Sequence, residues 1–325
     1  MLSTRLSLAL ENGVFELPTE GRIAVVGARR TDDLTMLPKE RTTVISRFYP
    51  DYHAFETQGF AVDVTPSNDT YAATVIALPR ARRAGQEMIA SAASATKGPL
   101  VIDGQKTDGI ASHLKALKSR ADIGEVISKA HGKLFVATGG DYSDWLFKPT
   151  KVEGFVTAPG VFSADGIDPG SKALVQALPK VMKGHVIDLG AGWGYLSDAV
   201  LKRDGAVSVT LVEADIVALN AAKQNITDER ATFLWDDATT HSGAPADHIV
   251  MNPPFHTDRA ANPDLGRAFI RQAAKLLKPK GTLWLVANRH LPYETTLEES
   301  FHTVQPLDQS ASYKIYSATR PKKPR

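Results

Sequence analysis

The tetrapeptide Asn252-Pro253-Pro254-Phe255 follows an apolar run, 249–251, that is typical of a buried strand. An amino nitrogen on a base or an amide shares its lone pair with a conjugated system, so it is a poor nucleophile until that pair is turned away. The Asn252 side-chain oxygen and the Pro253 carbonyl can accept hydrogen bonds from both N–H groups of such a nitrogen as it becomes tetrahedral. Pro253 and Pro254 restrict the backbone and so fix the direction of that carbonyl. Phe255 offers an apolar face on which a flat substrate can stack. The tetrapeptide therefore predicts group transfer to a nitrogen on a planar conjugated system.

A glycine loop, 188–194, lies upstream of the tetrapeptide, between an apolar strand and a helical pattern. It contains Asp188 and three glycines, Gly190, Gly192 and Gly194. Glycines let the backbone approach a ligand closely, and the start of a helix offers unpaired N–H groups. The loop predicts a cofactor site, for either a dinucleotide or S-adenosylmethionine (SAM).

Acidic side chains follow the next two predicted strands. Glu213 ends the first of them, where a carboxylate can accept hydrogen bonds from ribose hydroxyls, and Asp215 is the better candidate for the N-cap of the following helix. Asp236 and Asp237 end the second, where one of them can receive an adenine amino group. We favour Asp237, because Asp-Ala at this point is the usual form in SAM enzymes. A dehydrogenase would need no Asn-Pro-Pro-Phe turn, so the order of motifs favours SAM.

Strands and helices alternate in the second half, which predicts an α/β fold with a parallel sheet. The predicted strands there are His185–Leu189, Val207–Val212, Ala231–Trp235, His248–Met251, Thr282–Ala287 and Tyr313–Ala318. The predicted helices are Tyr195–Lys202, Ile216–Asn225, Gly266–Lys278 (stopped by 279–281) and Glu294–Phe301. A weaker alternation in the first half gives strands at Arg22–Val26, Thr43–Ile45, Tyr71–Leu78 and Pro99–Ile102 (closed by Asp103-Gly104), and a helix at Ala84–Ala95. Two copies of one Rossmann-like architecture are therefore expected, with domains at 1–150 and 151–325 and a boundary between 141 and 157.

Composition narrows the class of protein. A chain of 325 residues exceeds the usual size of one hydrophobic core. It has no cysteine, and its nine histidines show no metal-ligand spacing, so we expect no metal site. No run of apolar residues is long enough to span a bilayer and the start lacks a signal-peptide layout, so we expect a cytoplasmic protein without a membrane partner. With a net charge of only +2, phosphate contacts would have to come from local clusters such as Arg80, Arg82 and Arg83 or the tail 320–325; either could equally be solvated surface.

Four segments together resemble the bacterial 16S ribosomal RNA guanine-N2 methyltransferase C family. They are Pro159–Ser171, Asp188–Gly192, Asn252–His256 and Val286–Tyr293. The resemblance covers most of residues 155–320. It implies SAM as cofactor, the N2 amino group of a guanine in small-subunit ribosomal RNA as acceptor, and ribosomal RNA or a small-subunit particle as partner.

The resemblance also implies tandem class I methyltransferase domains, of which the first is degenerate. The first half agrees, because its glycine-loop position reads Gly27-Ala28-Arg29-Arg30 and its counterpart of the Asn-Pro-Pro-Phe turn reads Leu78-Pro79-Arg80. Residues 101–109 look like the family's first-domain strand and loop. By similarity, this domain would support folding or dock RNA.

The segment that contains Phe162 lies over the active site in the family. Phe162 is therefore expected to line the pocket for the base or the cofactor, or else to be a core residue like Val161. By similarity, Asp168, Gly170 and Ser171 at the start of the next helix would contact the methionine end of SAM.

Two kinds of alternative remain open. The acceptor could be adenine N6, a guanine of large-subunit RNA or a protein glutamine, although Phe255 in place of Tyr and the two-domain layout favour RNA. Alternatively, the protein could be an RNA-binding assembly factor whose methylation is secondary or lost. The oligomeric state is left open, and a monomer fits the sequence.

Overall fold

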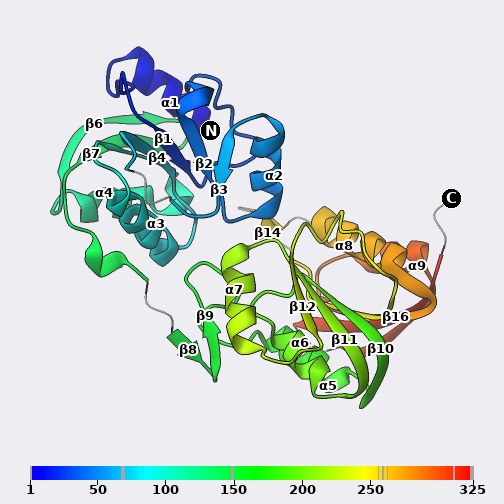
Figure 1. Ribbon diagram of the computed structural model, residues 1–325. Coiled ribbons are helices and arrows are strands. Elements are labelled where there is room, and N and C mark those ends of the chain that lie inside the picture. The colour runs from blue at the N-terminus through cyan, green and yellow to red at the C-terminus, as the bar shows by residue number, and fades with distance from the viewer. Residues whose placement is uncertain are drawn as a thin grey trace. The chain divides into compact units, whose positions relative to one another are not determined.

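The computed structural model describes residues 2–66, 70–147, 150–254, 256–257, 260–261, 263–309 and 312–322 (Figure 1). It divides into two compact units, Met1–Lys148 and Pro149–Arg325. The division falls inside the interval 141–157, where glycine, proline and lysine interrupt the hydrophobic periodicity.

The first unit is built on a seven-stranded sheet in the order β3-β2-β1-β4-β5-β7-β6. The strands β1 to β5 run parallel, whereas β7 pairs antiparallel with both β5 and β6. The strands are β1 (Ile23–Val26), β2 (Thr42–Ile45), β3 (Ala61–Asp63), β4 (Ala73–Ala77), β5 (Leu100–Gln105), β6 (Asp122–Lys129) and β7 (Gly132–Thr138). The helices are α1 (Leu2–Glu11), α2 (Tyr49–Thr57), α3 (Arg82–Ser94) and α4 (Ile110–Leu117), with short 3-10 turns at Lys39–Arg41, Lys106–Asp108 and Ser143–Trp145.

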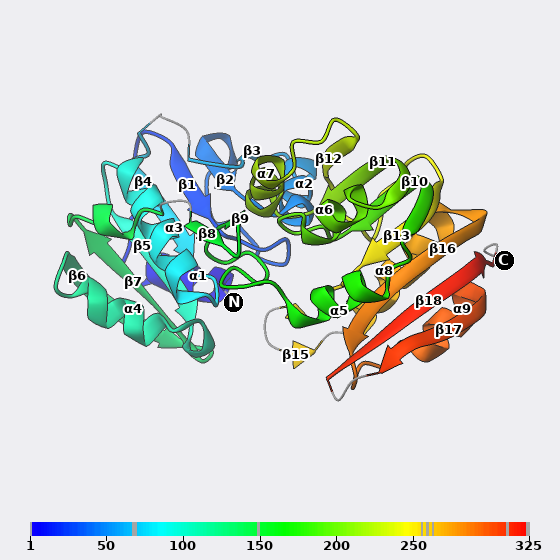
Figure 2. The same ribbon diagram turned by 90° about the horizontal axis from the view of Figure 1, so that it is seen from below.

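The second unit repeats this arrangement in the order β12-β11-β10-β13-β16-β18-β17, which Figure 2 displays from below. The first five strands of that order are parallel, whereas β18 pairs antiparallel with both β16 and β17. The strands are β10 (Val181–Leu189), β11 (Asp204–Glu213), β12 (Ala231–Trp235), β13 (Ala246–Met251), β16 (Leu277–Asn288), β17 (Phe301–Gln309) and β18 (Tyr313–Pro321). The helices are α5 (Pro169–Ala177), α6 (Tyr195–Leu201), α7 (Ile216–Asn225), α8 (Pro263–Leu276) and α9 (Glu294–Ser300), and two small hairpins pair β8 (Thr150–Val152) with β9 (Phe155–Thr157) and β14 (His256–Thr257) with β15 (Ala260–Ala261).

The matching strand orders confirm two Rossmann-like sheets in tandem. By position in the sheet, β1 corresponds to β10 and β4 to β13. The turn after β4, which begins at Leu78, is therefore the counterpart of the turn that begins at Asn252 after β13.

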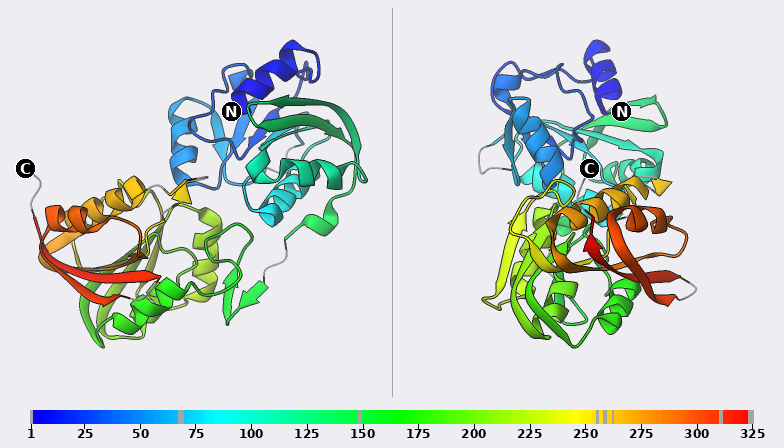
Figure 3. Two further views of the ribbon diagram at one scale, coloured as in Figure 1. Left: turned by 180° about the vertical axis from the view of Figure 1, so that it is seen from behind. Right: turned by 90° about the vertical axis from the view of Figure 1, so that its right-hand side faces the viewer.

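Apolar side chains on both faces of the second sheet explain its layers. One buried cluster joins α8 and α9 to the sheet through residues such as Phe269, Ile270 and Leu297. A second cluster joins α5, α6 and α7 to the opposite face through residues such as Leu174, Val200 and Leu219. Figure 3 (left) shows the two sets of helices on opposite sides of the strands. Such a sheet is buried on both faces, as parallel sheets are.

Several predicted bounds were wrong. The helix predicted at Gly266–Lys278 is α8, which ends at Leu276, and β16 begins at once, so that Pro279 lies within a strand instead of in a stop. In the first unit β5 continues through Asp103 and Gly104, because its backbone pairs with β7 as far as Gln105. The buried guanidinium of Arg5 pairs with the Asp103 carboxylate (Nη2 to Oδ2, 2.8 Å), which allows this acid to lie inside a strand. Edge strands such as β17 were missed, since its side chains are mostly exposed and show no alternation.

In the ranges that the structure describes, no helix combines the length and hydropathy needed to cross a bilayer. In the same ranges, no three His, Asp or Glu side chains gather so that they could hold a metal ion.

Candidate active site

The polar residues singled out in the second half meet at one edge of the second sheet. The glycine loop follows β10, Glu213 ends β11, Asp236 follows β12 and Asn252 follows β13. These four strands are parallel neighbours, so their carboxyl ends share an edge. The chain leaves β10 toward β11 and β12 and then returns to β13 on the other side, which makes the gap between β10 and β13 a topological switch point. Ligands of open α/β sheets bind at such points.

The glycine loop adopts a backbone that favours glycine. Gly190, Gly192 and Gly194 have φ values of +75°, +57° and +93°. A Cβ added at Gly194 would lie 2.8 Å from Ile226, whereas one at Gly192 would meet nothing within 4 Å. The Gly192 N–H donates to Glu213 Oε2 at 2.7 Å. The loop is thus tied to the end of β11, and Gly192 faces open space.

Two acidic side chains beside this loop, Asp188 and Glu213, have raised pKa values. Asp188 is fully buried, and burial raises its pKa to about 7 against a hydrogen bond from Ser197 Oγ (2.7 Å to Oδ2). Among the described residues its other oxygen, Oδ1, has no partner. Burial likewise raises the pKa of Glu213 to about 7, against hydrogen bonds from the N–H groups of Asp215 and Gly192. The charge of Glu213 adds to the effect of burial on the Asp188 pKa, so this pair of buried acids favours a cationic ligand.

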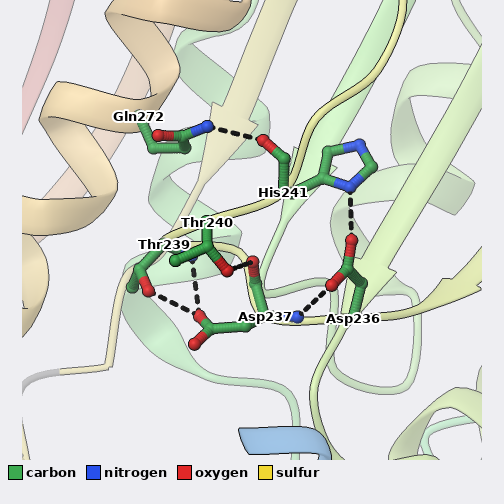
Figure 4. Close-up of polar contacts among 6 residues, drawn as sticks. All are labelled: Asp236, Asp237, Thr239, Thr240, His241 and Gln272. Carbon is green, nitrogen blue, oxygen red and sulfur yellow. Dashed lines mark hydrogen bonds and ion pairs between the residues drawn. The ribbon is translucent and has the colours of Figure 1, made fainter. Parts of the chain in front are cut away.

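The two adjacent acids after β12 differ in how many oxygens they have committed (Figure 4). Asp236 uses both, since Oδ1 accepts from the Asp237 N–H (2.7 Å) and Oδ2 contacts His241 Nδ1 (2.7 Å). Asp237 accepts from the N–H and hydroxyl of Thr239 through Oδ1 alone, at 2.8 and 2.6 Å. Gln272 Nε2 in turn donates to the His241 carbonyl. Asp237 therefore keeps an oxygen that the described residues do not use.

The Asn252 side chain has both amide hydrogens engaged. Its Nδ2 donates to Asp168 Oδ2 and to Ser171 Oγ, each at 2.9 Å. Asp168 is also the N-cap of α5, because the same Oδ2 accepts from the Ser171 N–H at 2.7 Å. A Cβ at Gly170 would lie 2.9 Å from the Tyr313 ring and 3.0 Å from Asp168 Oδ2. Two of the three residues expected at the methionine end of SAM, Asp168 and Ser171, thus hydrogen-bond Asn252, a contact the sequence did not predict.

The other members of the tetrapeptide differ in exposure. Pro253 is buried and Pro254 is exposed. Phe255, expected to stack on the substrate, lies outside the described residues.

Phe162 is held beside the glycine loop by a residue that sequence reasoning missed. Its side chain is 54% exposed while Val161 is buried, so the expectation of a core position is wrong for Phe162. Trp193 Nε1 donates to the Phe162 carbonyl at 3.0 Å, and its ring packs 5.0 Å from that of Phe155. The Asn225 amide bonds the Trp193 carbonyl and both backbone groups of residue 156. A tryptophan inside a glycine loop was the signal available in the sequence.

Comparisons with known proteins agree with this geometry. The family model of the methyltransferase small domain matches residues 153–317. Ribosomal RNA small subunit methyltransferase C of Shewanella pealeana is 31% identical over 268 residues, covering 78% of each chain. The protein of the same name from Shewanella sediminis is 28% identical over 310 residues, covering 87% of this chain and 90% of its own. Among solved structures, the 16S rRNA N2 G1207 methyltransferase of T. thermophilus, in complex with AdoMet and guanosine, superimposes with a TM-score of 0.81 at 26% identity, covering 94% of this chain and 90% of that one.

Proposed function

Because this chain belongs to the ribosomal RNA small subunit methyltransferase C family, we propose that it transfers a methyl group from SAM to the N2 amino group of a guanine in 16S ribosomal RNA. The observation that supports this most is the orientation of Asn252. Both hydrogens of its amide are bound by Asp168 and Ser171, so its oxygen is the group left to accept hydrogen bonds from a substrate.

The residues at the switch point fit SAM. SAM carries a sulfonium and an α-ammonium group, and a cation of this kind compensates the charges of Asp188 and Glu213, whose pKa values burial raises. Gly192 leaves the space that a side chain would fill. Asp237, with its uncommitted oxygen, is our assignment for the adenine amino group, and Glu213 is our assignment for the ribose.

The role we assign to the protein's own residues is to position the guanine amino group against the methyl group of SAM. SAM, when bound, supplies an electrophilic methyl group. Asn252 Oδ1 and the Pro253 carbonyl accept hydrogen bonds from the two N–H groups of the guanine amino group and turn its lone pair toward that methyl. Transfer would form the C–N bond and leave the electron pair of the broken C–S bond on sulfur. The nitrogen would then give up a proton to water, and no strong base is needed because the methylated nitrogen is acidic. Phe162, exposed beside the loop, is proposed as a face for the base or the cofactor.

The first unit is proposed to bind RNA rather than SAM. Its loop keeps one feature of a cofactor site, because the Gly27 N–H donates to the Ile45 carbonyl (3.2 Å) as Gly190 does to Val212 (2.9 Å). Arg29 and Arg30 follow, however, and Asp51 from α2 bonds both of them. In the turn after β4, which corresponds to the turn at Asn252, and in the first turn of α3, the chain carries the exposed side chains of Arg80, Arg82 and Arg83. Exposed arginines at the carboxyl edge of the sheet suit phosphate contacts.

Labelled methyl transfer tests this function. The purified protein and methyl-labelled SAM would be incubated in separate reactions with small-subunit RNA, large-subunit RNA and small-subunit particles, followed by nucleoside analysis of the RNA and amino-acid analysis of the particle proteins. We expect N2-methylguanosine from the small-subunit substrates. Label in N6-methyladenosine, in large-subunit RNA or in a protein glutamine would overturn the proposed acceptor. SAM binding without transfer to any of them would favour an assembly factor.

A further inference from the structure

We propose that Asp168 and Ser171 are positioning residues that lock the Asn252 amide with its oxygen toward the substrate amino group. The proposal rests on the proposed function, because it concerns the acceptor nitrogen. It assigns to α5 a role in methyl transfer that differs from a contact with the cofactor.

An asparagine amide has two orientations of nearly equal shape, and only one of them presents an acceptor. Nδ2 of Asn252 lies 2.9 Å from Asp168 Oδ2 and 2.9 Å from Ser171 Oγ. A rotation by half a turn would place Oδ1 against the Asp168 carboxylate, replacing a charge-assisted hydrogen bond with repulsion. The contact therefore selects the orientation that can hold an N–H bond of the substrate.

The lock is itself rigid. Asp168 Oδ2 also accepts from the Ser171 N–H at 2.7 Å, so the carboxylate is fixed by the N-cap of α5. Pro169 occupies the first turn and restricts φ there. A Cβ at position 170 would lie 3.0 Å from the same oxygen and 2.9 Å from the Tyr313 ring, so a side chain there would crowd the carboxylate. Ser171 is 7% exposed, so its hydroxyl is shielded from competing water.

The charge of Asp168 also acts through the amide. A carboxylate hydrogen-bonded to Nδ2 polarises the amide and makes Oδ1 a stronger acceptor. The acceptor nitrogen becomes more positive as the methyl arrives, so this effect is larger in the transition state than in the bound substrate. Asp168 should therefore influence the transfer rate more than RNA or SAM affinity.

A reciprocal exchange of the two side chains tests the lock. Asn252→Asp sets two carboxylates face to face and should slow single-turnover transfer by about 10²-fold or more. Asp168→Asn keeps an N-cap oxygen but loses the charge, and should slow transfer by about tenfold. In the double variant Asp168→Asn/Asn252→Asp, the new amide can donate to the new carboxylate. The double variant should recover at least about tenfold in rate over Asn252→Asp alone. Ser171→Thr, which keeps the hydroxyl, serves as the matched control for Ser171→Ala.

Readouts besides the rate separate this role from others. The SAM affinity of Asp168→Asn should stay within about twofold of wild type. Its thermal unfolding temperature should stay within a few degrees of wild type. If Asp168 contacted the methionine end of SAM instead, the affinity would fall at least tenfold and excess SAM would restore the rate, which would overturn the proposal. A double variant no faster than Asn252→Asp at unchanged stability would overturn it too.

A measurement on the free protein keeps the inference separate from the identity of the acceptor. With asparagine side chains labelled by nitrogen-15, the Asn252 amide signal is assigned by its loss in Asn252→Asp. Its hydrogens should exchange slowly in wild type and faster in both Asp168→Asn and Ser171→Ala. Fast exchange in wild type refutes the lock, whatever the substrate. A wild-type protein that transfers no methyl to any RNA refutes the proposed function alone, because the amide signal still decides this inference.

Discussion

Replacing Asp188 with asparagine should stabilise the cofactor-free protein at neutral and alkaline pH. The side chain is fully buried, and burial raises its pKa from 3.8 to about 7. Because the folded-state pKa lies above the unfolded-state value, the folded chain binds the proton more tightly, and its stability falls as the pH rises from about 4 to about 7. Each pKa unit corresponds to about 1.36 kcal/mol, so the ionised Asp188 costs roughly 4 kcal/mol above pH 7, of which about 2–3 kcal/mol is lost between pH 5 and pH 7.

The Asp188→Asn variant has no such titration, and its amide oxygen can still accept the Ser197 hydroxyl. We therefore expect its free energy of unfolding, relative to wild type, to rise by about 2–3 kcal/mol between pH 5 and pH 8. Urea unfolding followed by tryptophan fluorescence suits this test, because Trp193, Trp235 and Trp284 all lie in the second unit. Glu213 titrates in both proteins and largely cancels. A difference that stays constant with pH, or falls, would refute the reasoning about burial.

Other predictions follow from the same site. Calorimetry should find one SAM site per chain, and Gly192→Val should abolish it because φ at this residue is +57°; a second site, or a surviving one, would place the cofactor elsewhere. Glu213→Ala should weaken SAM binding by about tenfold or more yet leave transfer at saturating SAM within a few-fold of wild type, since ribose contacts are equal in ground and transition states; a rate loss that excess SAM does not rescue would contradict this assignment. Asp237→Asn should weaken SAM binding more than Asp236→Asn does, and the reverse order would show that adenine meets Asp236.

The sequence predicted those parts of the fold that have strong periodicity. The helix Ile216–Asn225 and the strand Ala231–Trp235 have the predicted bounds, and Asp215 caps the helix by accepting from the Val217 N–H. Parallel strands buried on both faces give continuous apolar runs, which are easy to find. The junction at Leu277 was missed because proline and glycine usually end a helix in a loop, whereas here the chain passes straight into β16.

The site could be predicted as a set of residues but not as a set of contacts. Asn252 and Asp168 were both singled out, yet their hydrogen bond joins residues far apart in the chain, and only tertiary packing brings them together. Asp236 and Asp237 cannot be told apart by spacing, because the difference depends on the positions of His241 and Thr239. Local patterns identify which chemistry is present, and the sheet determines which groups meet.

The rate of methyl transfer by Asn252→Ala tests the central claim most directly. Single-turnover transfer from saturating labelled SAM to small-subunit ribosomal RNA or particles would be compared with wild type and with Asn220→Ala, an exposed asparagine on α7. We predict that Asn252→Ala keeps SAM and RNA affinity but loses about 10²-fold or more in rate, the scale of one preorganised polar contact, while Asn220→Ala matches wild type. If Asn252→Ala transferred methyl at the wild-type rate, the turn after β13 would only end a strand, and the proposed mechanism would be wrong.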